Sequence, residues 1–273
     1  MIDTHQHFWN YDPIRDGWIT DEMKILQQDF RPEDLAPILD QNKIDGCISV
    51  QADPSEKETE FLLALAHQHS FVKGVVGWVD LCSDRINERL DYFSRFKPIK
   101  GFRHILQSAP AGFMKGKDFR YGIRQLEKYY FTYDVLIYYH QLPEAIEFVK
   151  QFPYQKFVID HLAKPAIKQK EFDGWSKGMK QLASFENVFC KISGFTAEAN
   201  WKTWQPNDFT PYFDFALQYF GARRLMYGSD WPVCLIASTY QSQLSLVEDF
   251  ISKLSASEKQ QIMGGNAIDF YNL

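Results

Sequence analysis

Four features that would point to particular classes of protein are missing from this chain of 273 residues. No apolar run approaches the roughly 18 residues of a membrane-spanning helix, and no basic start followed by an apolar segment marks a secretory signal. The four cysteines lack C-x-x-C spacing, and the net charge of -5 comes without a block of like charges. We therefore expect a cytoplasmic protein with reduced thiols, whose main partner is neither a membrane nor a nucleic acid.

The rest of the composition is that of a globular protein with a large core. Hydrophobic residues make up 45% and charged residues 24% of the chain, which is ordinary for a folded domain. No linker, repeat or low-complexity segment divides the sequence, so we expect a single domain over residues 1–273. The sequence does not indicate an oligomeric state. Aromatic residues are unusually frequent, with 23 Phe, 14 Tyr and 7 Trp. Much of the Phe belongs in the core, whereas several Trp fall at the ends of predicted strands.

Short apolar runs alternate with helical patterns along the whole chain. We predict one strand that opens at Ile2 and seven more over residues 45–51, 72–79, 99–104, 135–140, 156–161, 188–193 and 225–230. Helices are predicted between the strands, and two helical segments, 239–254 and 258–271, close the chain. This alternation is typical of an α/β fold, a single (β/α)₈ TIM barrel, with an extra C-terminal helix.

Ionisable side chains gather at the C-terminal ends of the predicted strands. They are His5, His7, Arg103, His104, His140, Asp160, His161, Lys191 and Asp230. A barrel of this kind has its active site at that rim. Because burying so many imidazoles and charges costs free energy unless they pair or bind something, we expect a functional site there.

The segment around His5 and His7 illustrates why the secondary structure matters. Side chains two residues apart on a strand point to the same side, so these two rings can share a metal ion or one substrate oxygen. His67 and His69 have the same spacing in a predicted helix, where residues two apart point in nearly opposite directions. Only the first pair is therefore a candidate for the site.

The order of these residues resembles the amidohydrolase superfamily. An Asp-x-His-x-His motif lies on strand one, histidines stand near the ends of strands five and six, and an aspartate ends strand eight. Longer segments look like the sugar-lactonase branch, which includes L-fuconolactone and L-rhamnonolactone hydrolases, with pyrone-dicarboxylate lactonase as a more distant relative. These segments are Lys100–His104, Ile159–Pro165, Lys191–Gly194, Tyr227–Val233 and Gly264–Ala267.

This resemblance implies a hydrolase that opens a sugar-derived lactone to its acid. Asp230 would be the general base that activates water and then returns the proton to the ring oxygen. His5 and His7 would polarise the carbonyl, either through a divalent ion or directly as hydrogen-bond donors. His161 would orient the water or the carbonyl. Because neighbouring side chains alternate along a strand, we expect His161 to face inward and Asp160 to help position its neighbours.

The resemblance also implies a metal-ligand set. One zinc-like ion would be held by His5, His7, Asp230 and a histidine from strand five, for which His140 is the candidate and Tyr138 the alternative inward residue. Strand four ends in an Arg-His pair rather than in Lys or Glu, so a two-metal centre is not expected. Metal-independent catalysis stays open, as in pyrone-dicarboxylate lactonase.

Substrate hydroxyl and carboxylate groups need fixed donors, and the C–H faces of sugars stack on aromatic rings. The donor candidates are Arg103, His104, His140, Lys164 and Lys191, and the aromatic candidates are Trp9, Trp18, Trp78 and Trp231. Lys164 could equally cap a surface loop, and Lys191 could pair with an acid inside the barrel.

Two other functions stay open: a metal-dependent carboxy-lyase of the same superfamily, and a barrel that binds a sugar acid without catalysis.

Overall fold

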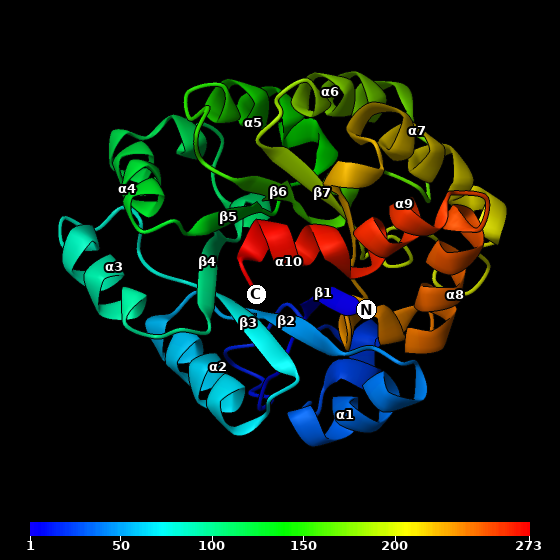
Figure 1. Ribbon diagram of the computed structural model, residues 1–273, viewed down its shortest axis with the longest axis horizontal. Helices are drawn as coiled ribbons and strands as arrows, with labels where there is room; N and C mark the ends of the chain where they lie inside the picture. The colour runs from blue at the N-terminus through cyan, green and yellow to red at the C-terminus, as the bar shows by residue number, and fades with distance from the viewer.

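Eight parallel strands form a barrel in the computed structural model, which describes all 273 residues (Figure 1). The strands follow chain order around the sheet, and each pairs with the next. They are β1 (Ile2–Gln6), β2 (Gly46–Val50), β3 (Val72–Gly77), β4 (Ile99–His104), β5 (Thr132–Val135), β6 (Phe157–Ile159), β7 (Val188–Ile192) and β8 (Leu225–Tyr227). The predicted TIM barrel is confirmed.

Helices cover the outer face of this sheet, as the buried and apolar strands require. In α4, for example, Phe119, Ile123 and Leu126 recur on one side of the helix and are all buried. The helices are α1 (Pro32–Gln41), α2 (Glu56–Gln68), α3 (Ile86–Ser94), α4 (Lys117–Lys128), α5 (Leu142–Val149), α6 (Asp173–Ala183), α7 (Thr210–Phe220), α8 (Tyr240–Ile251), α9 (Ala256–Gln260) and α10 (Asn266–Tyr271).

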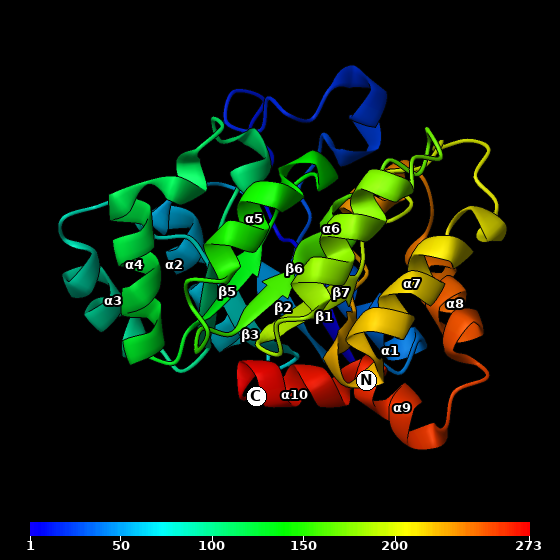
Figure 2. The same ribbon diagram turned by 90° about the horizontal axis from the view of Figure 1, so that it is seen from above.

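The last helix closes one end of the barrel. Figures 1 and 2 show α10 lying across the N-terminal ends of the strands, while the segment between β1 and α1 lies at the opposite end. Lys100 and Lys156, at the starts of two strands, donate hydrogen bonds to carbonyl groups of Asn272 and Asp269. The end that remains for a ligand is therefore the C-terminal rim of the strands.

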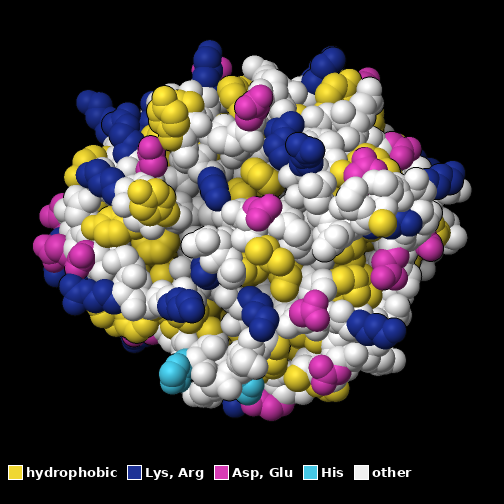
Figure 3. Space-filling view, in the orientation of Figure 1, with side chains coloured by type: hydrophobic (Ala, Val, Ile, Leu, Met, Phe, Trp, Pro, Cys, Tyr) yellow, Lys and Arg dark blue, Asp and Glu magenta, His cyan; other side chains and the backbone are white.

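The face around α10 carries basic and acidic side chains that are interspersed, with no extended area of one charge (Figure 3). All four cysteines are free thiols, as predicted, and three of them are buried. None of the helices combines the length and the hydropathy that crossing a bilayer requires.

Strand five lies earlier in the chain than predicted. β5 covers Thr132–Val135, whereas the sequence favoured residues 135–140. The apolar residues after Val135 leave the sheet and lead into a short 3₁₀ turn, Tyr139–Gln141. This shift places Asp134 inside the barrel, fully buried, and leaves His140 on the exposed turn.

Candidate active site

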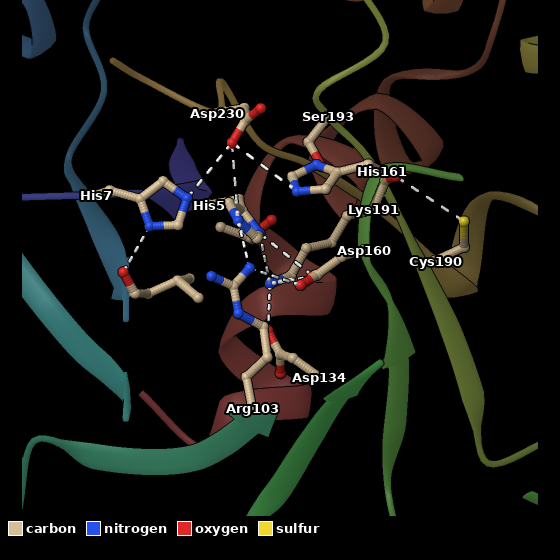
Figure 4. A network of polar contacts seen from close by, with 12 residues as sticks. His5, His7, Arg103, Asp134, Asp160, His161, Cys190, Lys191, Ser193 and Asp230 are labelled. Carbon is tan, nitrogen blue, oxygen red and sulfur yellow. Dashed lines mark hydrogen bonds and ion pairs between the residues drawn. The ribbon is translucent and has the colours of Figure 1, made fainter. Parts of the chain in front are cut away.

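Asp230 lies among three imidazole rings at the C-terminal end of the barrel (Figure 4). Its Oδ1 is 3.5 Å from Nε2 of His7, and 3.9 Å from Nε2 of both His5 and His161. Backbone hydrogen bonds hold the first and last strands together at this point, since the Asp230 amide donates to the His5 carbonyl at 2.8 Å. The histidine pair near the N-terminus and the aspartate after β8 therefore meet in one buried group.

Burial disfavours charge on the rings of this group. It lowers the pKa of His5 well below the ordinary value and lowers the pKa of His161 to about 4, so both rings are neutral near pH 7. Burial alone would raise the pKa of Asp230, but the imidazoles, His161 foremost, hold that pKa below the usual range. The site thus combines an ionised carboxylate with neutral imidazoles.

Hydrogen bonds on the far side of the His7 ring determine which nitrogen carries its proton. Nδ1 of His7 is 2.7 Å from the carbonyl oxygen of Val50, and a carbonyl only accepts, so Nδ1 carries the hydrogen. Nε2 faces Oδ1 of the Asp230 carboxylate at 3.5 Å. In a buried site, either a proton on Nε2 or a metal ion bound between the two groups stabilises the carboxylate.

The donor set around Asp230 suits one divalent ion. His5, His161 and Asp230 each offer a ligand atom, and these atoms lie within 4.8 Å of one another. His7 adds a further imidazole nitrogen from the other side. Imidazole nitrogen and carboxylate oxygen are both ligands that zinc takes in proteins.

The structure does not bring His140 into this group. Its side chain is exposed on the 3₁₀ turn that follows β5, and its ring stacks on Tyr138 with centroids 5.7 Å apart. The physical reason is the earlier end of β5, because the chain has already left the barrel wall at this residue. The position predicted for a strand-five ligand is therefore corrected, and the third imidazole beside Asp230 comes from His161.

The alternation of side chains between the two faces of the sheet ends directly after β6. Residues 161–164 all have left-handed backbone conformations, with φ of 53°, 55°, 57° and 47°, which turn the chain out of the sheet. As a result His161 faces Asp230 while Asp160 faces His5, so both neighbours reach the interior and not one alone. Gly194 makes room for this turn, since a Cβ there would lie 2.5 Å from Nδ1 of His161.

A buried ionic network lies on the other side of the His5 ring (Figure 4). Asp160 places Oδ1 3.3 Å from Nδ1 of His5 and Oδ2 3.1 Å from the guanidinium of Arg103. Lys191 Nζ is 3.1 Å from Asp160 and 2.5 Å from Asp134. Lys191 therefore pairs with acids inside the barrel, one of the two possibilities that the sequence left open. Two cations and two carboxylates balance one another there.

A cavity of about 1030 Å³ opens above Asp230. Its lining includes these predicted substrate-binding residues: Trp9, Trp18, Trp78, Arg103, His104 and Lys164. His104 holds Nε2 2.8 Å from the Val79 carbonyl and stacks on Trp78. Trp231 does not line the cavity; it is 2% exposed and packs edge-on against Phe30.

Sequence reasoning missed three residues of the site. Asp134 was hidden by the misplaced strand five, although the alternation in residues 131–135 could have revealed it. Ser193, whose hydroxyl is 2.9 Å from Nδ1 of His161, lies within a segment that the family resemblance had already singled out. Glu198, which lines the cavity and pairs with Lys164 at 3.6 Å, follows no strand directly and had no local signal.

Comparisons with known proteins agree with this geometry along the whole chain. The family described as amidohydrolase matches residues 2–273. An L-fucono-1,5-lactonase of Burkholderia multivorans is 37% identical over 284 residues, which cover 100% of this chain and 96% of the relative. An L-fucono-1,5-lactonase of Burkholderia ambifaria is 33% identical over 282 residues, which cover 100% of this chain and 95% of the relative.

The fold of a solved structure is also similar over the whole chain. An amidohydrolase from Burkholderia multivorans with bound zinc superposes with a TM-score of 0.96 at 38% identity. The superposition covers 100% of this chain and 99% of that one. The likeness therefore extends over the barrel and its loops alike.

Proposed function

Because this chain belongs to the amidohydrolase family, which matches residues 2–273, we propose that it hydrolyses a sugar-derived lactone to the open acid. The observation that carries this proposal is the ionised Asp230 among three imidazoles at the base of a large, Trp-lined cavity. The two L-fucono-1,5-lactonases that are similar over the whole chain support a cyclic sugar ester as the substrate.

Asp230 moves the proton in the proposed reaction. Its carboxylate accepts a proton from water while the water oxygen forms a bond to the lactone carbonyl carbon. The resulting tetrahedral intermediate collapses when the bond between that carbon and the ring oxygen breaks. The protonated carboxyl then gives its proton to the departing ring oxygen, which yields a hydroxy acid and restores the carboxylate.

The negative charge that develops on the carbonyl oxygen needs a cation or fixed donors close by. His5, His7, His161 and Asp230 would hold one zinc-like ion, which would supply Lewis-acid polarisation of the carbonyl. Two features favour this ligand set: the ligand atoms of His5, His161 and Asp230 lie within 4.8 Å of one another, and the similar amidohydrolase has zinc bound. Asp160 would keep the proton on Nδ1 of His5, which leaves the Nε2 lone pair to accept from Arg103 at 3.2 Å or to bind an ion.

Metal analysis tests the ligand set independently of turnover. The purified chain should bind about one zinc ion, and His7→Ala should weaken zinc binding by more than the roughly 10–100-fold typical of outer-shell changes. His104→Ala is the matched control, because His104 lines the same cavity but hydrogen-bonds to Val79 instead. Isothermal titration with zinc measures both variants. Equal zinc affinity in wild type and His7→Ala would contradict the assignment.

A panel of aldonolactones, beginning with L-fucono-1,5-lactone, tests the reaction itself. Ring opening releases a proton, so a pH indicator follows turnover by the pure protein with and without added zinc or manganese. We expect turnover well above the spontaneous rate for at least one neutral sugar lactone. Two results would contradict the proposal: no turnover of any lactone in either condition, or carbon dioxide release from an aromatic acid without lactone opening.

A further inference from the structure

One wall of the cavity carries an ion pair that takes no part in the proposed chemistry. Lys164 Nζ lies 3.6 Å from the Glu198 carboxylate, and both side chains line the cavity together with Asp230. The two side chains are only 18% and 20% exposed. An ion pair this sheltered is screened less by solvent than a surface pair, so its charges act on whatever enters the cavity.

The backbone fixes the position of Lys164 relative to the reacting groups. It ends the left-handed run that begins at His161, and its amide donates to the His161 carbonyl at 2.8 Å. Its ammonium also lies 5.3 Å from the ring centroid of Tyr138, another residue of the cavity lining. Lys164 is therefore held over the cavity by the same turn that places His161.

A backbone hydrogen bond also fixes the loop that carries Glu198. Its carbonyl accepts a hydrogen bond from the Lys168 amide at 3.1 Å, which ties the loop after β7 to the loop after β6. Burial raises the pKa of Glu198, while Lys164 opposes that effect. The ion-pair partner of Glu198 is thus the ammonium group of Lys164, at 3.6 Å.

The other charges of the cavity leave no spare cation. The Asp, Glu, Lys and Arg residues of the lining are Asp80, Arg103, Lys164, Glu198 and Asp230. Arg103 donates to the Gln51 carbonyl and to Asp160, and Lys164 is paired with Glu198. Both cationic side chains of the lining are thus already paired, so a substrate carboxylate finds no free ammonium or guanidinium group there.

We propose that Glu198, by neutralising Lys164, determines the charge selectivity of the cavity: neutral lactones are accepted and lactones that carry a free carboxylate are rejected. This inference rests on the proposed lactonase function and adds the residue that sets its substrate class. Removing the charge of Glu198 releases Lys164, whose ammonium then pairs with a substrate carboxylate at the same place in the cavity.

The test compares two lactones of one sugar, a neutral aldonolactone and the corresponding aldarolactone, in which the terminal carbon is oxidised to a carboxylate. Glu198→Gln should raise the ratio of kcat/KM for the acidic lactone to that for the neutral one by roughly tenfold or more. Glu198→Asp keeps the charge and should stay near the wild-type ratio. Glu22→Gln is the matched control, because this exposed glutamate shares a smaller pocket with Glu198 but forms no ion pair with Lys164.

A double variant shows whether the released lysine causes the gain. Adding Lys164→Met to Glu198→Gln should return the ratio toward the wild-type value. A ratio in Glu198→Gln within about twofold of wild type would overturn the inference, and so would an equal gain in Glu22→Gln. If the wild type opens neither lactone nor any neutral aldonolactone, the proposed function itself fails, which is a distinct result.

Discussion

Asp230→Asn should lower kcat for lactone opening by about 10²–10⁴-fold, the range that a positioned general base contributes. The amide cannot take a proton from water, yet it has nearly the same shape as the carboxyl group. It also cannot replace the anionic acceptor that three imidazole nitrogens surround within 3.9 Å. The loss should therefore appear in kcat, measured by the indicator assay at saturating lactone.

The fold should survive this change, because the backbone amide and not the side chain of Asp230 bonds to the His5 carbonyl. Circular dichroism and thermal unfolding should match those of wild type. Asp80→Asn is the control, since Asp80 is an exposed carboxylate of the same cavity and forms no ion pair with His5, His7 or His161. If Asp230→Asn opens lactones at the wild-type rate, Asp230 is not the base.

The barrel could be predicted from the sequence because its strands are short, apolar and regularly spaced. β4 occupies Ile99–His104 as predicted, since Pro98 precedes the run and the polar residues Arg103 and His104 end it. β5 was misplaced because Leu136 and Ile137 are as apolar as a strand but are buried beyond the sheet. An apolar run therefore indicates burial more reliably than it indicates where a strand ends.

The meeting of the N-terminal histidines with Asp230 could also be expected, because parallel strands in a barrel end at the same rim. The directions in which the side chains of His161 and Asp160 point could not be predicted. Both His161 and Asp230 adopt positive φ, 53° and 58°, which non-glycine residues rarely do. No local residue type indicates such a turn. Strand alternation therefore gives the wrong direction for the side chain of Asp160, which also faces the interior. The catalytic roles of these residues stay predictions until the variants are measured.

Lys191 is the residue whose loss should damage both stability and chemistry. Its ammonium is fully buried and lies 2.5 Å from Asp134, 3.1 Å from Asp160 and 3.2 Å from Nδ1 of His5. Burial raises the pKa of Asp134 to about 6 even though Lys191 opposes it. The hydroxyl of Tyr271 on α10 donates to the same carboxyl at 3.0 Å, so the network reaches from the closed end of the barrel to the site.

Lys191→Met should lower the free energy of unfolding by about 3–5 kcal/mol, the usual effect of breaking a buried ion pair from one side. Methionine fills a similar volume, so the effect reports the charge and not a cavity. Chemical denaturation measures it. Lys73→Met is the control on β3, where the same substitution at an exposed position should change stability by no more than about 0.5 kcal/mol.

The double variant Lys191→Met with Asp134→Asn separates charge balance from positioning. Removing both charges leaves Arg103 and Asp160 as a balanced pair at 3.1 Å, so most of the lost stability should return. The rate should stay low, because Asp160 no longer has the ammonium that holds its Oδ1 beside Nδ1 of His5. If the single variant is as stable as wild type, the network does not depend on this charge. If the double variant regains full kcat, Lys191 only balances charge and does not position His5.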